Sequence, residues 1–405
     1  MLSQIQIAVG CRVWRESIRG FLDPVVRVWV IVFLFVDPSS GWAKTLHKPT
    51  SQEERDAVLE TARQIGAALP GLGYAYGELS DGTFTMAGSV VKLSDTIAVT
   101  AAHASQHWSE GEYVDVWIGF GNFQDGLDGK ETTYKVSAIY RHPVFDLALY
   151  SLADNPVSGV PNAVIRKDIL PVNQPIVIGG YGQYSHVSGP ILGYGEKLGA
   201  RGIISGDLPE EMPEHYQYCL FTGDTGLDDY HAEGGLVDTW DSGGGVYTEV
   251  DGEHRLVGII EVKAGEREYG SYSGFLPLSH PGAYQFINQY LDSDGDGQSN
   301  FTEDALGSDG HVTNSFANTP LEIHSEGGGV RMILSHLALL DSTVVYKGQH
   351  SEDLSEWVDA QQVSNPSSLP TAPDGYSWLS WEVNSTSRMQ FLRVLPEAQL
   401  NLIWE

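Results

Sequence analysis

Three residues that are far apart in the chain carry the side chains needed for nucleophilic catalysis. His103 ends the run VTAAH, Asp146 lies in FDLALYSL, and Ser242 lies in the glycine-rich run WDSGGG. A serine hydroxyl is a weak nucleophile at neutral pH, so it needs an imidazole to take its proton and a carboxylate to hold that imidazole. The order His, Asp, Ser is one of the known chain orders of such a triad. The sequence therefore predicts His103 as general base and then general acid, Asp146 as its partner and Ser242 as the nucleophile.

The runs around these residues resemble the motifs of chymotrypsin-like (trypsin-fold) serine proteases. VTAAH is similar to the histidine motif of that family, FDLALYSL to its aspartate motif and WDSGGG to its serine motif, GDSGGP. Supporting similarities are GSVV at residues 88–91, GGYG at residues 179–182 and LVGII at residues 256–260. The resemblance covers residues 71–291. It implies an all-β fold of two packed six-stranded barrels with a short C-terminal helix, and hydrolysis of peptide bonds through an acyl-enzyme.

The resemblance also implies where the other parts of the site lie. The backbone N–H groups of Trp240 and Ser242 would form the oxyanion hole, in which one donor contributes about 10²–10³ in rate. Trp240 stands where the family has glycine, which orients that peptide without strain from a Cβ atom. Leu236, Glu261 and Lys263 fall at substrate-binding positions. Leu236 stands where trypsin-like enzymes carry an aspartate, so a preference for Arg or Lys is not implied.

Two interpretations of substrate preference remain open at this point. Leu236 and Val237 would give the pocket an apolar floor, whereas Lys263, if it enters the pocket, would favour acidic side chains. Activation also departs from the pattern, because no Ile-Val-Gly-Gly run occurs near residues 71–88. We therefore expect Asp241 to find a partner other than a newly freed amine, or the domain to form without trypsinogen-like activation.

Two other functions are compatible with the same motifs. Trp240 and Glu261 would suit a catalytically inactive protease homologue that acts as a binding or adhesion module, although the intact triad argues against it. An esterase using the same site is a third possibility, which a comparison of amide with ester substrates would separate. The main prediction is a serine endopeptidase whose partner is a protein or peptide substrate.

Composition narrows the partners and the compartment. The net charge is −30, with 53 acidic and 23 basic residues. A basic surface is needed to bind nucleic acid, so nucleic acid is excluded as a partner, and docking on an anionic membrane is disfavoured. We expect a monomer. Catalysis itself is expected to need no cofactor.

The N-terminal residues 1–43 are predicted to be a secretion signal. Arginines precede an apolar run at residues 28–36, and Gly41-Trp42-Ala43 is a small-x-small cleavage pattern. The apolar run is short for a bilayer span, although an uncleaved membrane anchor stays possible. The mature chain would have no membrane span and would be secreted, periplasmic or at the cell surface of a bacterium. It would keep one cysteine, Cys219, which we expect to be a buried apolar side chain.

Hydrophobic periodicity divides the rest of the chain. Residues 44–70 are polar at first and then helical, with a helix predicted to begin at Ser51. This segment would be a propeptide or would pack on the next domain. Residues 71–291 show short β-rich runs, at residues 90–93, 97–100, 114–118, 147–152, 176–178 and 256–262, and then a helix at residues 281–291. Residues 309–405 are predicted to form a small β-sandwich-like domain, with tryptophans in its core or on a carbohydrate-binding face.

An acidic segment at residues 292–308 connects these two parts. Residues 292–303 match an EF-hand-type calcium loop at every ligand position. The predicted ligands are Asp292, Asp294, Asp296, Gln298, Asn300 and Glu303. Oxygen ligands of this charge suit Ca²⁺ in a structural role, and the alternative is a flexible acidic linker.

Overall fold

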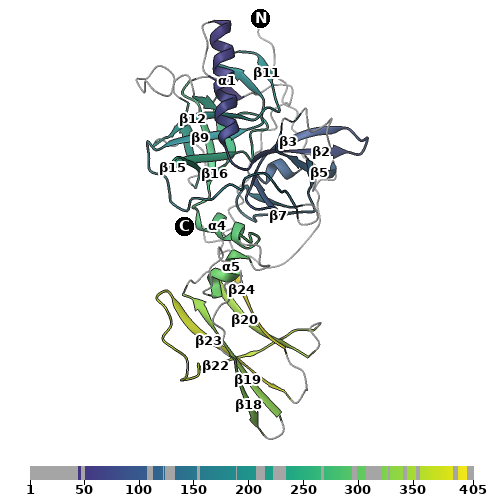
Figure 1. Cartoon of the computed structure of the whole chain (residues 1–405), viewed down its shortest axis with the longest axis vertical. Helices are drawn as coiled ribbons and strands as arrows, with labels where there is room; N and C mark the ends of the chain where they lie inside the picture. Colours follow the sequence, from purple (N-terminus) through teal and green to yellow (C-terminus); the bar gives the residue numbers. More distant parts are fainter. Residues whose placement is uncertain are drawn as a thin grey trace, which may run out of the picture. The chain divides into compact units, whose positions relative to one another are not determined.

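The computed structural model describes residues 44–46, 51–106, 113–121, 123, 133–152, 156–187, 189–206, 215–221, 234–265, 269–293, 299–306, 321–326, 329–340, 344–352, 356–385 and 391–398 (Figure 1). The predicted secretion signal at residues 1–43 lies outside them. None of the helices in these ranges has the length and apolar character that crossing a membrane requires. The predicted all-β class is confirmed, since strands dominate the described chain.

Seven strands after residue 71 form one antiparallel sheet, in the order β6-β5-β2-β3-β4-β8-β7. Their bounds are β2 (Leu72–Leu79), β3 (Phe84–Lys92), β4 (Ile97–Thr100), β5 (Tyr113–Gly119), β6 (Thr133–Lys135), β7 (Ala138–Arg141) and β8 (Ala148–Ser151). Strand β4 pairs with β8 so that Thr100 lies opposite Ala148. The segment after β4, which carries His103 in a one-turn 3₁₀ helix (His103–Ser105), is thereby brought beside the segment before β8, which carries Asp146.

A closed six-stranded barrel follows, in the order β12-β13-β17-β16-β15-β9. Its strands are β9 (Pro175–Gly180), β12 (Leu198–Ile204), β13 (Gln217–Leu220), β15 (Gly245–Val250), β16 (Glu253–Ala264) and β17 (Tyr272–Pro277). The turn that carries Ser242 leads directly into β15. One barrel of the expected size is therefore present, whereas the seven strands of the other sheet are not closed into a ring among the described residues.

The sheet and the barrel share one hydrophobic core. Tyr74 and Leu149 from the seven-stranded sheet and Tyr247 and Leu256 from the barrel are all buried in the same cluster. Apolar burial is the main favourable contribution to folding, so the two halves stabilise each other. Residues at the junction between the sheet and the barrel are therefore in contact with both of them.

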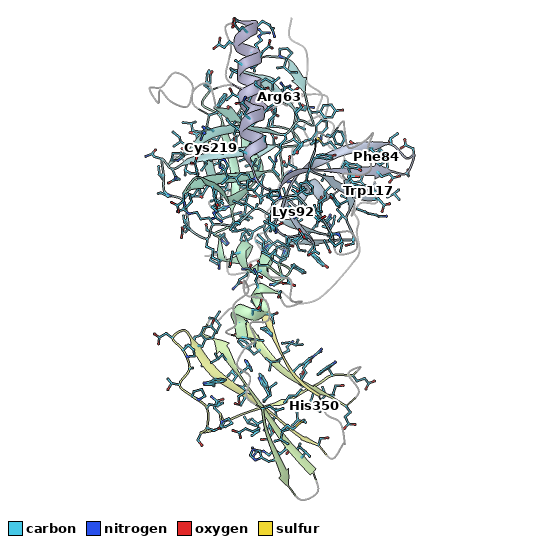
Figure 2. The ribbon with its side chains drawn as sticks, viewed as in Figure 1. Arg63, Phe84, Lys92, Trp117, Cys219 and His350 are labelled. Atoms are coloured by element: carbon cyan, nitrogen blue, oxygen red, sulfur yellow. The ribbon has the colours of Figure 1, made fainter. Side chains whose placement is uncertain are left out.

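Helix α1 (Gln52–Ala68) packs against the barrel. The hydroxyl of Ser51 accepts a hydrogen bond from the N–H of Glu54 at 3.1 Å, which confirms the predicted helix start. Arg63 on α1 donates to the carboxylate of Glu196 at 2.7 Å (Figure 2). Gly66 lies so close to β12 that a Cβ atom there would come within 2.5 Å of the Lys197 carbonyl oxygen. The helix is thus a packed part of this fold.

A small four-stranded sheet, in the order β11-β10-β1-β14, accompanies this helix. Its strands are β1 (Lys44–Leu46), β10 (Tyr184–His186), β11 (Ile191–Gly193) and β14 (Gly235–Leu236). Two further helices come after the barrel, α4 (Pro281–Asn288) and α5 (Asn300–Leu306). The first of them corresponds to the helix predicted at residues 281–291.

The C-terminal residues form two sheets, in the orders β18-β19-β23-β22 and β21-β20-β24. Their strands are β18 (Leu321–Glu326), β19 (Gly329–Leu339), β20 (Val344–Ser351), β21 (Val358–Asp359), β22 (Gln361–Val363), β23 (Tyr376–Ser385) and β24 (Phe391–Ala398). Gly348 on β20 lies against the ring of Trp381 on β23, so the two sheets contact each other at this point. Trp378 and Trp381 are buried, as expected for core residues, while Trp404 lies outside the described residues.

Candidate active site

His103 and Asp146 form a directly hydrogen-bonded pair. The Nδ1 of the imidazole is hydrogen-bonded to Asp146 Oδ2, and the backbone N–H of His103 donates to Asp146 Oδ1 at 2.7 Å. Burial opposes ionisation of Asp146, but the hydrogen bonds and charge of His103 outweigh it and hold the pKa of this carboxyl below its ordinary value. A proton on Nδ1 leaves Nε2 as the acceptor of the neutral ring. This is the state that a general base needs.

His142 holds the turn that presents Asp146. Its Nδ1 accepts hydrogen bonds from the N–H groups of Val144 at 3.1 Å and Phe145 at 2.8 Å, and its ring stacks on Phe145. Burial, together with the charge of His280, lowers the pKa of His142 to about 4, so the ring stays neutral and able to accept. No motif in the sequence assigns a role to His142. Only its place two to three residues before the backbone groups that it accepts from could have suggested this role.

The turn with Ser242 is held against the seven-stranded sheet. Ser89 on β3 donates its N–H to the Ser242 carbonyl at 2.8 Å. Gly243 has φ +84°, and a Cβ atom there would lie 2.1 Å from Ser89 O and 3.1 Å from the backbone nitrogen of Ala101. Only glycine fits this approach and this φ without strain. The serine motif is thereby packed on the end of β4, from which the histidine motif continues.

Gly88 marks the place where the serine and histidine motifs meet. A Cβ atom built on Gly88 would lie 2.8 Å from the Ser242 carbonyl oxygen and 3.1 Å from the Cβ of Ala104, the residue after His103. The backbone of β3 at Gly88 therefore lies between the two motifs, and both motifs are in close contact with it. A larger residue at this position would push the motifs apart.

Trp240 adopts the backbone conformation that is usual for glycine. Its φ is +69°, in the left-handed region that costs a non-glycine residue about 1–2 kcal/mol. Its ring packs edge-on against Tyr194 with centroids 5.2 Å apart, and Ser89 Oγ donates to its carbonyl at 2.9 Å. Within the described part of the chain, the N–H groups of Trp240 and Ser242 donate to no protein acceptor.

Asp241 has the alternative partners that the sequence led us to expect. Its buried carboxylate accepts hydrogen bonds from the N–H of Gly182 and the N–H of Asp238, each at 3.0 Å. A Cβ atom on Gly182 would lie 2.7 Å from this carboxyl group, so glycine permits the close approach. Backbone N–H groups thus stabilise the charge that precedes the nucleophile.

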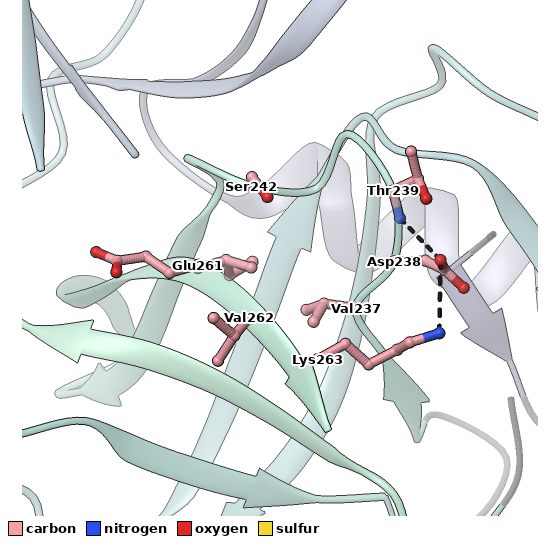
Figure 3. Close-up of a pocket in the computed structure, with 8 residues that line it drawn as sticks. Val237, Asp238, Thr239, Ser242, Glu261, Val262 and Lys263 are labelled. Carbon is pink, nitrogen blue, oxygen red and sulfur yellow. Dashed lines mark hydrogen bonds and ion pairs between the residues drawn. The ribbon is translucent and has the colours of Figure 1, made fainter. Parts of the chain in front are cut away.

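A cavity of about 190 Å³ opens beside Ser242 (Figure 3). Val237 and Val262 contribute apolar walls, and Lys263 extends toward Asp238, with Nζ and Oδ1 3.8 Å apart. Ser242, Thr239, Ile260 and Glu261 complete the lining. The cavity thus extends from Ser242 to residues 260–263 of β16, and two of the three predicted substrate-binding residues, Glu261 and Lys263, line it.

Leu236 does not line this cavity. It is fully buried on β14 and packs against Val187 and Phe221, while its neighbour Val237 faces the cavity instead. Alternate residues of an extended segment point to opposite sides, which explains why only one of these two neighbours lines the cavity. Of the two residues expected to form an apolar floor, Val237 therefore lines the cavity and Leu236 does not.

Glu261 is an unusual carboxyl group at this site. It is 5 % exposed, and its Oε2 accepts a hydrogen bond from the Tyr216 hydroxyl. Burial and the nearby charge of Asp146 raise the pKa of Glu261 to about 9, although the bond from Tyr216 opposes this. Glu261 is therefore uncharged at neutral pH and adds no second negative charge beside the His103–Asp146 pair.

The calcium loop is only partly described. Asp294, Asp296 and Gln298 lie outside the described residues, so the predicted ligand set stays a prediction. Glu303 on α5 is fully buried, and Asn300 Oδ1 accepts from the N–H of Ser293 at 2.9 Å. Among the residues that the structure does describe, no group of three His, Cys, Asp or Glu side chains is placed to hold a metal ion.

Cys219 is not a second nucleophile. It is 1 % exposed on β13, inside the barrel (Figure 2), and burial raises its thiol pKa to about 12. The interpretation as a buried apolar side chain is confirmed.

Comparisons of the sequence with models of known protein families and with curated proteins find no match. The function is therefore inferred from the site itself.

Proposed function

We propose that this chain is a serine endopeptidase that hydrolyses peptide bonds through an acyl-enzyme. The observation that carries the proposal is the bonded His103–Asp146 pair, with the turn of Ser242 packed on the strand that leads into His103. A polar pair of this kind beside a serine and a cavity is the arrangement that activates a hydroxyl nucleophile. The sequence motifs around all three residues resemble those of chymotrypsin-like proteases, which supports the same function.

The residues would act in sequence. Ser242 Oγ attacks the substrate carbonyl while His103 Nε2 takes its proton, and Asp146 stabilises the imidazolium that forms. The N–H groups of Trp240 and Ser242 hold the developing oxyanion, and His103 then returns the proton to the leaving amine. A water molecule, activated by the same histidine, releases the acid product and regenerates the serine.

The proposed fold is the chymotrypsin-like double barrel. The closed barrel would be its second half, and the seven-stranded sheet, which shares a core with it, would be its first half. His103 and Asp146 come from the first half and Ser242 from the second, so the site lies at their junction. The predicted secretion signal supports the proposal that the protein acts outside the cytoplasm of a bacterium. We also propose that it acts as a monomer on protein or peptide substrates.

We also propose that the segment at residues 292–303 binds Ca²⁺ in a structural role. The support is the complete spacing of oxygen ligands in the sequence. Asp292 would be the ligand at the start of the segment, Asn300 a ligand within it, and Glu303 at its end would close the site. The ion would stabilise the connection between the barrel and the C-terminal sheets.

Labelling with a fluorophosphonate probe tests the proposed activity. The purified protein, in calcium-containing buffer, should be labelled covalently, and the Ser242→Ala variant should not. A folded protein that stays unlabelled would contradict the proposal and favour the binding or adhesion module. Hydrolysis of matched amide and ester substrates then separates a peptidase from an esterase.

A further inference from the structure

The cavity beside Ser242 is small enough to receive one side chain. Its volume of about 190 Å³ is somewhat larger than the roughly 150 Å³ of an engineered protein cavity that binds benzene. Pockets for whole small molecules are commonly about 300–1,000 Å³. The cavity therefore suits a single side chain of the substrate and not an extended ligand.

The two charged side chains of the cavity compensate each other. Lys263 Nζ lies 3.8 Å from Asp238 Oδ1, and the exposed fractions of the two side chains are 7 % and 0 % (Figure 3). Asp238 Oδ1 also accepts the N–H of Thr239 at 2.8 Å. Away from water the attraction between such charges is strong, so the pair stays closed and the net charge of the wall is zero.

Glu261 adds no charge to the cavity. In Figure 3 its carboxyl group points away from Lys263 and Val237, and it is bonded to Tyr216. At neutral pH this carboxyl is protonated because burial raises its pKa to about 9. The other lining residues are Val237, Ile260 and Val262, which contribute apolar side chains, and Thr239 and Ser242, which contribute uncharged hydroxyl groups.

A charged substrate side chain would find no opposite charge that is free to receive it. It would have to break the Lys263–Asp238 pair or lose its water without compensation, and both are unfavourable. An aliphatic side chain would instead bury its surface against the valines and the isoleucine. We propose that this cavity selects an uncharged, aliphatic side chain on the acyl side of the cleaved bond, an inference that rests on the proposed function.

The test uses peptide substrates that differ only in the residue on the acyl side of the bond: Ala, Val, Leu, Glu or Lys. For the unmodified protein, kcat/KM is expected to be at least about 10-fold higher for Val or Leu than for Glu or Lys. Preference of the unmodified protein for Glu would overturn the inference by showing that Lys263 receives the substrate. Equal cleavage of all five peptides would also overturn it.

Charge variants sharpen this test. Asp238→Asn keeps an acceptor for Thr239 but removes the partner of Lys263, so it should shift preference toward Glu. Lys263→Met should shift preference toward Lys, and the double variant should return to Val and Leu. Unchanged preferences in both single variants would contradict the compensated pair.

Fluorophosphonate labelling of each protein keeps two failures apart. A protein that is labelled and cleaves peptides with the wrong preference overturns only the inference about the cavity. A folded protein that is neither labelled nor active overturns the proposed function, and the inference with it.

Discussion

The hydroxyl of Ser89 donates a hydrogen bond of 2.9 Å to the backbone carbonyl of Trp240, across the junction between the seven-stranded sheet and the barrel. The Ser89 hydroxyl oxygen also accepts a hydrogen bond of 2.9 Å from the N–H of Tyr181. The backbone N–H of Ser89 donates to the carbonyl oxygen of Ser242. Ser89 is fully buried. One residue of β3 therefore holds the turn with Ser242 against the seven-stranded sheet.

Replacing Ser89 by alanine should impair catalysis more than substrate binding. The change leaves the carbonyl of Trp240 and the N–H of Tyr181 without their partner, at a cost of about 1–3 kcal/mol for each buried group. Because the turn carries the N–H groups proposed to hold the oxyanion, we expect kcat to fall by about 10-fold or more with a small change in KM. Steady-state kinetics measure this. Ser137→Ala, which removes a hydroxyl bonded to the Ser151 carbonyl at 3.0 Å, is the matched control. Equal kinetics in both variants would show that Ser89 does not position the turn.

The side chain of Trp240 should be dispensable for the chemistry but not for packing. Trp240→Gly relieves the cost of φ +69° while losing the contact with Tyr194, whereas Trp240→Ala loses that contact and keeps the strain. The free energy of unfolding of the glycine variant should therefore exceed that of the alanine variant by about 1 kcal/mol, as measured by denaturant unfolding. Both should react with fluorophosphonate, because the backbone N–H group is retained. A glycine variant less stable than the alanine variant would contradict this account.

Glu261 should make the folded state less stable as pH rises. Its pKa is about 9 in the folded protein against an ordinary value of 4.5, so the unfolded state loses this proton first. The stabilisation is complete below about pH 4.5, decreases above it, and is lost as the pH passes through the folded value. From this group alone the slope approaches about 1.4 kcal/mol per pH unit. Urea unfolding of Glu261→Gln should show a flatter profile over this range. A parallel profile in the variant would mean that Glu261 is ionised in the folded protein.

His142 should act in the opposite direction, at acidic pH. Its pKa is lowered to about 4, mainly by burial and also by His280, so the unfolded state takes up a proton first as the pH falls. The stabilisation is present above about pH 6.5 and is lost as the pH falls through the folded value. Protonation also removes the acceptor for Val144 and Phe145, so the turn of Asp146 loosens. His142→Asn, which keeps an acceptor, should retain activity at neutral pH and lose less stability on acidification. The partly buried His254 offers a control variant, His254→Asn, that should leave the activity profile unchanged below pH 6.5.

Ca²⁺ should raise the melting temperature and protect residues 292–303 from proteolysis. Excess chelator should reverse both effects, since an ion that binds only the folded state stabilises it by mass action. Glu303→Gln should weaken the response, because the bidentate carboxylate is lost. Glu352→Gln, a change at an exposed residue, should respond as the unmodified protein does. An identical response in both variants would show that Ca²⁺ does not bind through Glu303.

Local patterns in the sequence determined much of the secondary structure. Ser51 begins a helix, the β-rich run at residues 90–93 overlaps the end of β3, and the run at residues 97–100 is β4, since capping and strand periodicity depend on neighbouring residues. The motifs likewise named His103, Asp146 and Ser242 as candidates.

The tertiary structure decided which of these residues meet. Strand register, and not spacing in the chain, places Asp146 beside His103, and the packing of Gly243 on β4 places the serine turn. The pairing of Lys263 with Asp238 and the burial of Leu236 depend on which side of the barrel wall each residue faces. The sequence by itself therefore determined the chemical groups and their local structure. Their charge states and contacts were decided by the fold, because burial and long-range pairing exist only once the two halves have packed together.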